Sequence, residues 1–260
     1  MTLNVVRAGE GTPVVLLHGL TATHRYVVMG SKNLERGGHQ VIAYDARGHG
    51  ASDPADSYSY DDLAADLRGV MDDAGIGRAV LAGASMGAHT ALRFALEHPD
   101  RAAGLLVMTP GFDPDQVGDA TVLARWDMLA DALRTGGVDG FVEAYGPPSP
   151  DERWTKTLTT VLRQRMELHE HPLAVADALQ QTPRSQPFAQ LGDLGAIACP
   201  VTVVGTRDAP DPGHPLDLAN RYAAALGTDL IVEEPGASPI AWQGGKVSAL
   251  ITTLAEAAEF

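Results

Sequence analysis

The sequence predicts an α/β fold in which a mostly parallel, doubly wound sheet carries an inserted helical cap. Short apolar runs alternate with segments of helical spacing in the first part of the chain, an order typical of βα units. Between residues 112 and 194 the strand-like runs stop and helical patterns continue, and two further βα units follow. The predicted organisation is therefore a core of residues 1–111 and 195–260 and a cap of residues 112–194.

The individual elements follow from apolar periodicity. Strands of a parallel sheet with helices on both faces are short, nearly continuous apolar runs; these occupy residues 3–7, 14–17, 41–44, 79–82, 103–108, 201–205 and 230–233. Apolar residues spaced three and four apart predict helices; these cover residues 31–37, 60–74, 86–98, 119–135, 138–145, 151–169, 173–181, 216–226 and 245–259.

Composition narrows the function classes. The chain has 260 residues, 45% of them hydrophobic, and a formal net charge of −14. Such an acidic chain repels nucleic acid and anionic membranes, so a small-molecule substrate is the expected partner. The single cysteine, Cys199, permits no intrachain disulfide, and the segment MTLNVVR lacks the features of a signal peptide; both favour a cytoplasmic location.

The stretch GASMG, residues 83–87, carries the strongest chemical signal. It follows a predicted strand and opens a predicted helix, and its flanking glycines permit a sharp turn that lifts Ser85 above the sheet. The helix N-terminus beside this serine supplies backbone N–H groups that can stabilise an oxyanion. Ser85 is therefore a candidate nucleophile, and the N–H of Met86 is a candidate oxyanion donor.

Two further motifs follow strands. His18, Gly19 and Leu20 end the strand at 14–17, where the chain runs beside Ser85; the N–H of Leu20 is the second candidate oxyanion donor, and His18 is interpreted as structural. The stretch DARGHGAS, residues 45–52, follows the strand at 41–44. We expect Asp45 and Arg47 to form a buried charge pair that shapes this loop.

Together these three motifs resemble the α/β-hydrolase superfamily, and more narrowly its small bacterial esterase, lactonase and cofactor-free perhydrolase branch. The resemblance covers nearly the whole chain. It implies cleavage of a small-molecule ester, lactone or thioester through an acyl-enzyme on Ser85, with no cofactor and no metal. The serine in this turn argues against epoxide hydrolases and haloalkane dehalogenases, which resemble this chain but have an aspartate at that position.

The resemblance also implies an acid and a histidine, in that order after the serine. The acid belongs after the strand at 201–205, where Asp208 has the usual offset and Asp211 is a rival; we expect Asp208. The histidine belongs after the last strand, in a loop that reads Pro-Gly-x-x-His in the family. This chain reads PGASP, so Pro239 stands in its place, and no histidine follows His214.

The missing histidine leaves two hypotheses. His214, on the acid loop, or His24, beside the oxyanion loop, supplies the base; alternatively the protein binds a ligand in the same capped pocket without hydrolysing it. Gly19, His24 and the cap residue Trp126 are expected to contact the substrate. His214 is the predicted base, together with Ser85 and Asp208.

Overall fold

The computed structural model describes residues 1–147, 152–208, 211–258 and 260. Its sheet has the order β1-β3-β2-β4-β5-β6-β7; β1 pairs antiparallel with β3 and every other pair is parallel. The strands are Val5–Ala8, Thr12–Leu17, His39–Tyr44, Ala79–Ala84, Ala102–Met108, Val201–Val204 and Leu230–Ile231, numbered β1 to β7. Each lies where an apolar run predicts it, so the predicted mostly parallel sheet is confirmed.

The helices follow the predicted segments closely. They are Asn33–Arg36, Tyr60–Asp73, Met86–Glu97, Ala120–Tyr145, Glu152–Met166, Pro172–Gln181, Leu216–Ala225 and Gly244–Ala257, numbered α1 to α8. Helix α4 joins the two segments predicted at 119–135 and 138–145, with a kink at Gly137, whose φ is 60°. Residues 151 and 259, the predicted ends of two helices, lie outside the described residues. None of the described helices is long and apolar enough to cross a membrane.

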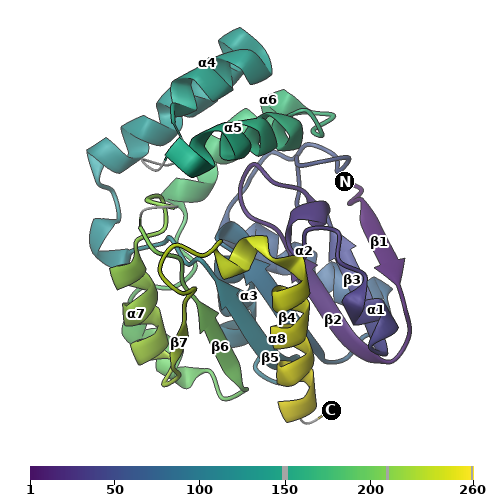
Figure 1. The fold of residues 1–260 in the computed structure, drawn as a ribbon. Helices are drawn as coiled ribbons and strands as arrows, with labels where there is room; N and C mark the ends of the chain where they lie inside the picture. The colour runs from purple at the N-terminus through teal and green to yellow at the C-terminus, as the bar shows by residue number, and fades with distance from the viewer. Residues whose placement is uncertain (148–151, 209–210, 259) are drawn as a thin grey trace.

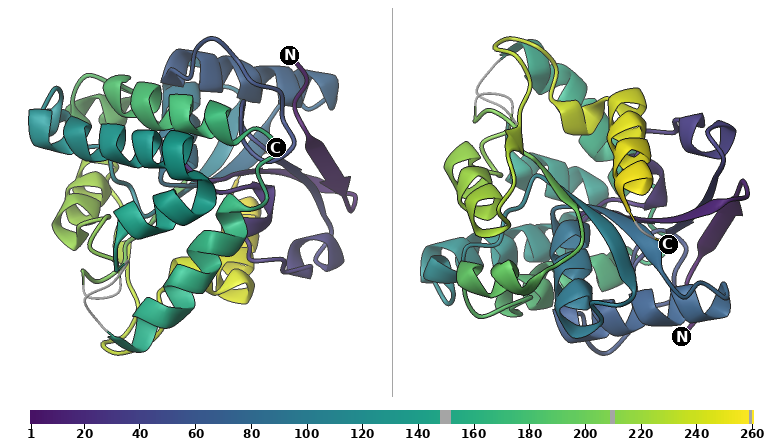
Figure 2. Two further views of the ribbon diagram at one scale, coloured as in Figure 1. Left: turned by 90° about the horizontal axis from the view of Figure 1, so that it is seen from above. Right: turned by 90° about the horizontal axis from the view of Figure 1, so that it is seen from below.

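Alternating side chains of the strands fill two separate cores. Val15, Leu17 and Leu81 face helices α2, α3 and α7. Val14 and Leu16 face helices α1 and α8 instead. Figure 2 shows this layering, with the yellow C-terminal helix on one side of the sheet and the blue helices on the other. The sheet is therefore covered on both faces, and the loops that leave its carboxyl edge are free to build a site.

Helices α4, α5 and α6 lie together above the carboxyl edge of the sheet (Figure 1). They have an apolar cluster of their own, which includes Leu133, Phe141, Leu162 and Val175. The side chain of Leu20 packs against this cluster and also against a core cluster around Tyr60. The helices between β5 and β6 thus form a separately packed layer, and the proposed cap boundaries at 112 and 194 remain a prediction.

Asp45 and Arg47 do not form the expected charge pair. Asp45 accepts hydrogen bonds from the backbone N–H of His24 (2.8 Å) and from Asn4 Nδ2 (2.7 Å). Arg47 instead bonds Asp66 through Nε and Nη2, at 2.7 and 2.8 Å. The prediction is wrong because the two side chains turn toward different elements, Asp45 toward the N-terminal segment and Arg47 toward α2.

Three buried histidines connect the core to the helical layer. His49 lies between His18 and His169, with ring centroids 5.3 and 5.6 Å away. Nε2 of His18 accepts from the N–H of Ala46, and Nδ1 of His169 accepts from the N–H of Gly50, both at 2.8 Å. Burial, helped by the neighbouring imidazole of His49, lowers the pKa of His18 and of His169 to about 3. His18 therefore has the structural role expected for it.

This cluster makes stability depend on pH. The folded state keeps His18 and His169 neutral down to about pH 3, whereas the unfolded chain takes up protons near pH 6.5. The free energy of unfolding should therefore fall as pH drops from 6.5, by at most about 1.4 kcal/mol per pH unit for each histidine. In urea titrations between pH 7.5 and 5, His169→Gln should show a shallower pH slope than the wild type; equal slopes would contradict the prediction.

Candidate active site

The turn at Ser85 is shaped by backbone crowding. Ser85 has φ 49° and ψ −115°, a strained conformation for a residue other than glycine. A Cβ at Gly83 would lie 2.3 Å from the carbonyl oxygen of Gly87, and one at Gly87 would lie 2.2 Å from that of Leu17. Only glycine fits at both positions, so the sequence fixes a sharp turn between β4 and α3 with the Ser85 side chain at its apex.

His214 lies against this serine. Its Nε2 is 3.0 Å from Ser85 Oγ, and its Nδ1 is 2.9 Å from Asp211 Oδ2. With Nδ1–H donating to the carboxylate, Nε2 is left to accept the hydroxyl proton. The arrangement is the serine–imidazole–carboxylate chain that activates a hydroxyl as a nucleophile.

Asp208 lies elsewhere, so the preference for Asp208 over Asp211 is corrected. Oδ1 of Asp208 accepts from the N–H of Leu216 at 2.8 Å, at the start of α7. The usual offset assumes a histidine that arrives from a later loop. Here Asp211 and His214 share the loop between β6 and α7, and the backbone N–H of His214 bonds the carbonyl of Asp211 at 3.3 Å, which brings Asp211 to the imidazole.

The charges of the pair support each other. Burial on its own would lower the pKa of His214, but the charge of Asp211 and its hydrogen bond outweigh burial and raise that pKa above 6.5. Burial would raise the pKa of Asp211, yet the imidazole holds it below its ordinary value. The side chains of His214 and Asp211 remain 27% and 20% exposed, so a substrate can reach them.

The loop after β5 supports the imidazole. A Cβ at Gly111 would lie 3.0 Å from Cδ2 of His214, so the backbone there lies directly against the ring. Nε2 of His89 accepts from the N–H groups of Gly111 and Phe112, at 3.1 and 3.2 Å, and its Nδ1–H donates to the Tyr60 hydroxyl. Burial, with the charge of His214, lowers the pKa of His89 to about 3, which keeps it an acceptor.

Two candidate backbone donors are close to the serine, one at the next residue, Met86, and one at Leu20, next to Gly19. The N–H groups of Leu20 and Met86 have no acceptor among the residues that the structure describes. Gly19 brings its loop to Ser85, since a Cβ built there would lie 3.5 Å from that of the serine. Leu20 and Met86 pack their side chains in one cluster with Tyr60, which holds both amides in place. They are the candidate oxyanion donors that the sequence predicts.

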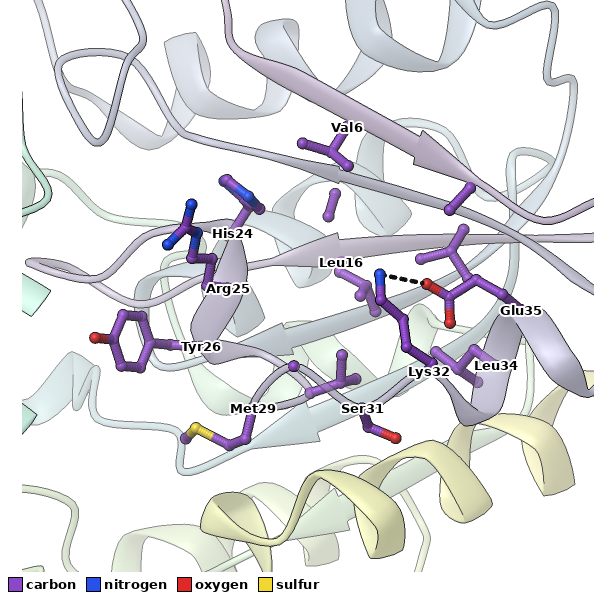
Figure 3. Close-up of a pocket in the computed structure, with 15 residues that line it drawn as sticks. Val6, Leu16, His24, Arg25, Tyr26, Met29, Ser31, Lys32, Leu34 and Glu35 are labelled. Carbon is purple, nitrogen blue, oxygen red and sulfur yellow. Dashed lines mark hydrogen bonds and ion pairs between the residues drawn. The ribbon is translucent and has the colours of Figure 1, made fainter.

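His24 does not approach Ser85. Its Nδ1 is 2.8 Å from Asp45 Oδ1, and it lines a cavity of about 510 Å³ (Figure 3). Val6, Arg25 and Met29 line the same cavity, but Ser85, Asp211 and His214 do not. His24 is therefore not the base in this structure, because Asp45 holds its imidazole at a different site.

The loop that would carry the family's histidine has become a packing element. Pro239 precedes a short helix, Ile240–Trp242, whose Ile240 enters the core beside α8. Trp242 meets Trp154 of α5, with ring centroids 5.7 Å apart. Trp126, the predicted substrate contact in the cap, packs half-buried against the apolar cluster of α4–α6, so its contact with a substrate remains a prediction.

Comparison with known proteins agrees with this architecture. Residues 12–198 match the model of the alpha/beta hydrolase fold family. The chain belongs to the α/β-hydrolase fold family. A relative named AB hydrolase superfamily protein YisY, from Bacillus subtilis, is 33% identical over 173 residues, which are 66% of this chain and 60% of YisY. The sn-1-specific diacylglycerol lipase ABHD11 of Danio rerio is 37% identical over 101 residues, 38% of this chain and 32% of that protein.

Solved structures extend the likeness over the whole chain. A thermophilic esterase from Thermogutta terrifontis is 25% identical with a TM-score of 0.81, over 99% of this α/β-hydrolase and 94% of the esterase. An enol-lactonase from Burkholderia xenovorans has a TM-score of 0.77 at 21% identity, over 98% and 94% of the two chains, which shows a shared fold. The family membership and the predicted fold class are thus established, while YisY and the lipase are matched over less than two thirds of their lengths.

Proposed function

We propose that this α/β-hydrolase cleaves a small-molecule ester, lactone or thioester through an acyl-enzyme on Ser85. The observation that supports it is the continuous hydrogen-bonded chain from Ser85 Oγ through His214 to Asp211, at 3.0 and 2.9 Å. The names of its relatives, which include esterases and lactonases, agree with this reaction class. In this proposal His214 acts as the base, in place of the histidine that is missing at Pro239.

In the first half of the reaction, Nε2 of His214 takes the Ser85 proton as Oγ attacks the substrate carbonyl. The developing oxyanion is stabilised by the N–H groups of Leu20 and Met86. His214 is then an imidazolium whose charge Asp211 balances. As the tetrahedral intermediate collapses, His214 gives the proton to the departing alcohol or thiol, and the acyl group remains on Ser85.

In the second half, His214 accepts a proton from water, and the resulting hydroxide attacks the acyl carbonyl. The same two backbone donors stabilise the second oxyanion. Collapse of this intermediate breaks the bond to Ser85 Oγ, which recovers its proton from His214. The free acid leaves, and the enzyme returns to its starting protonation state.

Covalent labelling tests the proposal directly. A fluorophosphonate probe should label the wild type within minutes at one site, and peptide mass spectrometry should locate the adduct on Ser85. Ser85→Ala should remain unlabelled while its thermal unfolding temperature stays close to that of the wild type. Labelling that is no faster in the wild type than in Ser85→Ala would reject the hydrolase and favour a protein that only binds its ligand.

A further inference from the structure

A buried carboxylate follows the last strand of the sheet. Glu233 lies two residues beyond β7 and is only 4% exposed. Its Oε1 accepts a hydrogen bond from the backbone N–H of Arg207 at 2.9 Å, while Oε2 is buried without a hydrogen-bond partner among the residues that the structure describes. Enclosing a carboxylate with one oxygen unbonded costs free energy, so packing and stability alone do not explain a glutamate at this position.

The partner of this carboxylate, Arg207, lies at the start of the loop between β6 and α7. A second hydrogen bond joins the two residues, because Nε of Arg207 donates to the backbone carbonyl of Glu233 at 3.1 Å. Just before them along the two chains, the N–H of Gly205 bonds the carbonyl of Ile231 at 2.9 Å. The contact between residues 207 and 233 therefore continues the pairing of β6 with β7 beyond the strands and fixes where the loop leaves the sheet.

Hydrogen bonds lead from Arg207 to the candidate acid and base. The carbonyl of Arg207 accepts from the N–H of Asp211, and the carbonyl of Asp211 accepts from the N–H of His214, both at 3.3 Å. The carboxylate of Asp211 then bonds Nδ1 of His214 at 2.9 Å. A displacement of Arg207 would therefore move both side chains relative to Ser85. Misplacing a reacting group by about 1 Å can cost on the order of 100-fold in rate.

We propose that Glu233 is a positioning residue, which acts through Arg207 to hold the imidazole of His214 against the serine. This inference rests on the proposed hydrolase function. Glu233 itself takes no part in the chemistry, since its Oε1 is occupied by the N–H of Arg207. A hydrogen bond from a backbone N–H to a carboxylate is stronger than one between neutral groups, which suits it to fixing the start of a loop. The end of β7, where the family's histidine is missing, thus supports the loop that carries His214.

The kinetic test compares two replacements of this carboxylate. Glu233→Leu removes the acceptor for the N–H of Arg207 and should lower kcat/KM for 4-nitrophenyl acetate by about 10- to 100-fold. Glu233→Gln keeps a side-chain oxygen that can accept the same bond, so it should remain within about threefold of the wild type. Rates are measured well below the unfolding temperature of each variant. An unchanged rate in Glu233→Leu, or an equal loss in Glu233→Gln, would overturn the proposal.

Glu234→Leu is the matched control, because it makes the same substitution at the next position, where the side chain is exposed. It should keep kcat/KM within about threefold of the wild type. A loss in Glu234→Leu as large as that in Glu233→Leu would attribute the effect to a general disturbance of this strand end and would overturn the proposal.

An NMR titration of His214 separates this inference from the hydrolase proposal, because it requires no turnover. Burial and the charge of Arg165 lower the pKa of this imidazole, but the charge and hydrogen bond of Asp211 outweigh them and raise it. Burial keeps the neighbouring His89 neutral, with a pKa of about 3.

The titration follows the Cε1–H signal of His214, which is assigned by its loss in His214→Ala. Glu233→Leu loosens the bond from the imidazole to Asp211, so His214 should titrate at a lower pH than in the wild type, and Glu233→Gln should titrate as the wild type does. An unchanged titration in Glu233→Leu would reject the positioning role even where the serine is labelled. A shift to lower pH would support it even where no ester is hydrolysed.

Discussion

Replacing His214 by alanine should reduce kcat/KM for an activated ester by roughly 10³- to 10⁶-fold, the loss expected when a serine hydrolase loses its base. In the proposed mechanism the imidazole accepts the proton of Ser85 Oγ, which lies 3.0 Å from its Nε2. Without it the hydroxyl is a poor nucleophile, and only binding and the oxyanion donors remain. Initial rates with a 4-nitrophenyl ester and the rate of fluorophosphonate labelling measure the effect.

His24→Ala is the control for this change, because the sequence offers His24 as the other candidate base. Its imidazole is bonded to Asp45, so the variant should keep kcat/KM within about threefold of the wild type, with a modest loss of stability. A large loss of labelling in His24→Ala, together with retained labelling in His214→Ala, would show that the base is His24 and that the assignment to His214 is wrong.

Asp211→Asn should lower kcat/KM by about 10³- to 10⁴-fold, whereas Asp208→Asn should change it by less than about threefold. Asp211 fixes the tautomer of His214 and balances its charge, while Asp208 bonds the N–H of Leu216 at the start of α7. The two asparagine variants remove the same charge from the same loop. Steady-state kinetics on one ester therefore shows which of the two aspartates is the acid. Equal losses of kcat/KM in both variants would contradict the assignment to Asp211.

The same pair of variants should differ in pH dependence. The reaction needs neutral His214, so kcat/KM falls as pH drops through its pKa, which Asp211 raises above 6.5. Asp211→Asn removes the main contribution that raises this pKa, so the acid limb of its pH profile should move to lower pH. The plateau value of kcat/KM in this variant should also be much lower than in the wild type. Asp208→Asn should leave the position of the limb unchanged.

Local sequence patterns were sufficient for the sheet and for Ser85. The strands can be recognised as apolar runs in the local sequence, and Gly83 and Gly87 mark the turn at Ser85, although Gly87 is required by its close approach to the carbonyl of Leu17. The predicted break between helical segments likewise coincides with the kink at Gly137. These features can be predicted from local patterns even where distant contacts explain them.

The remaining parts of the site depend on contacts between distant segments. The choice between Asp208 and Asp211 is decided by the path of one loop over Ser85, which spacing alone does not specify. Asp45 and Arg47 are neighbours in sequence but bond residues of different elements. Gly111 was missed because a glycine after a strand has no distinctive local pattern.

Asp211 and His214, the proposed acid and base, lie only three positions apart on a single turn. Ser85 and His214 are separated by 129 positions, so a crossover between related genes can bring a serine together with a foreign histidine. No crossover outside this short turn can separate Asp211 from His214. The two residues are inherited as one unit, and a single transplanted peptide would carry both into another member of the fold.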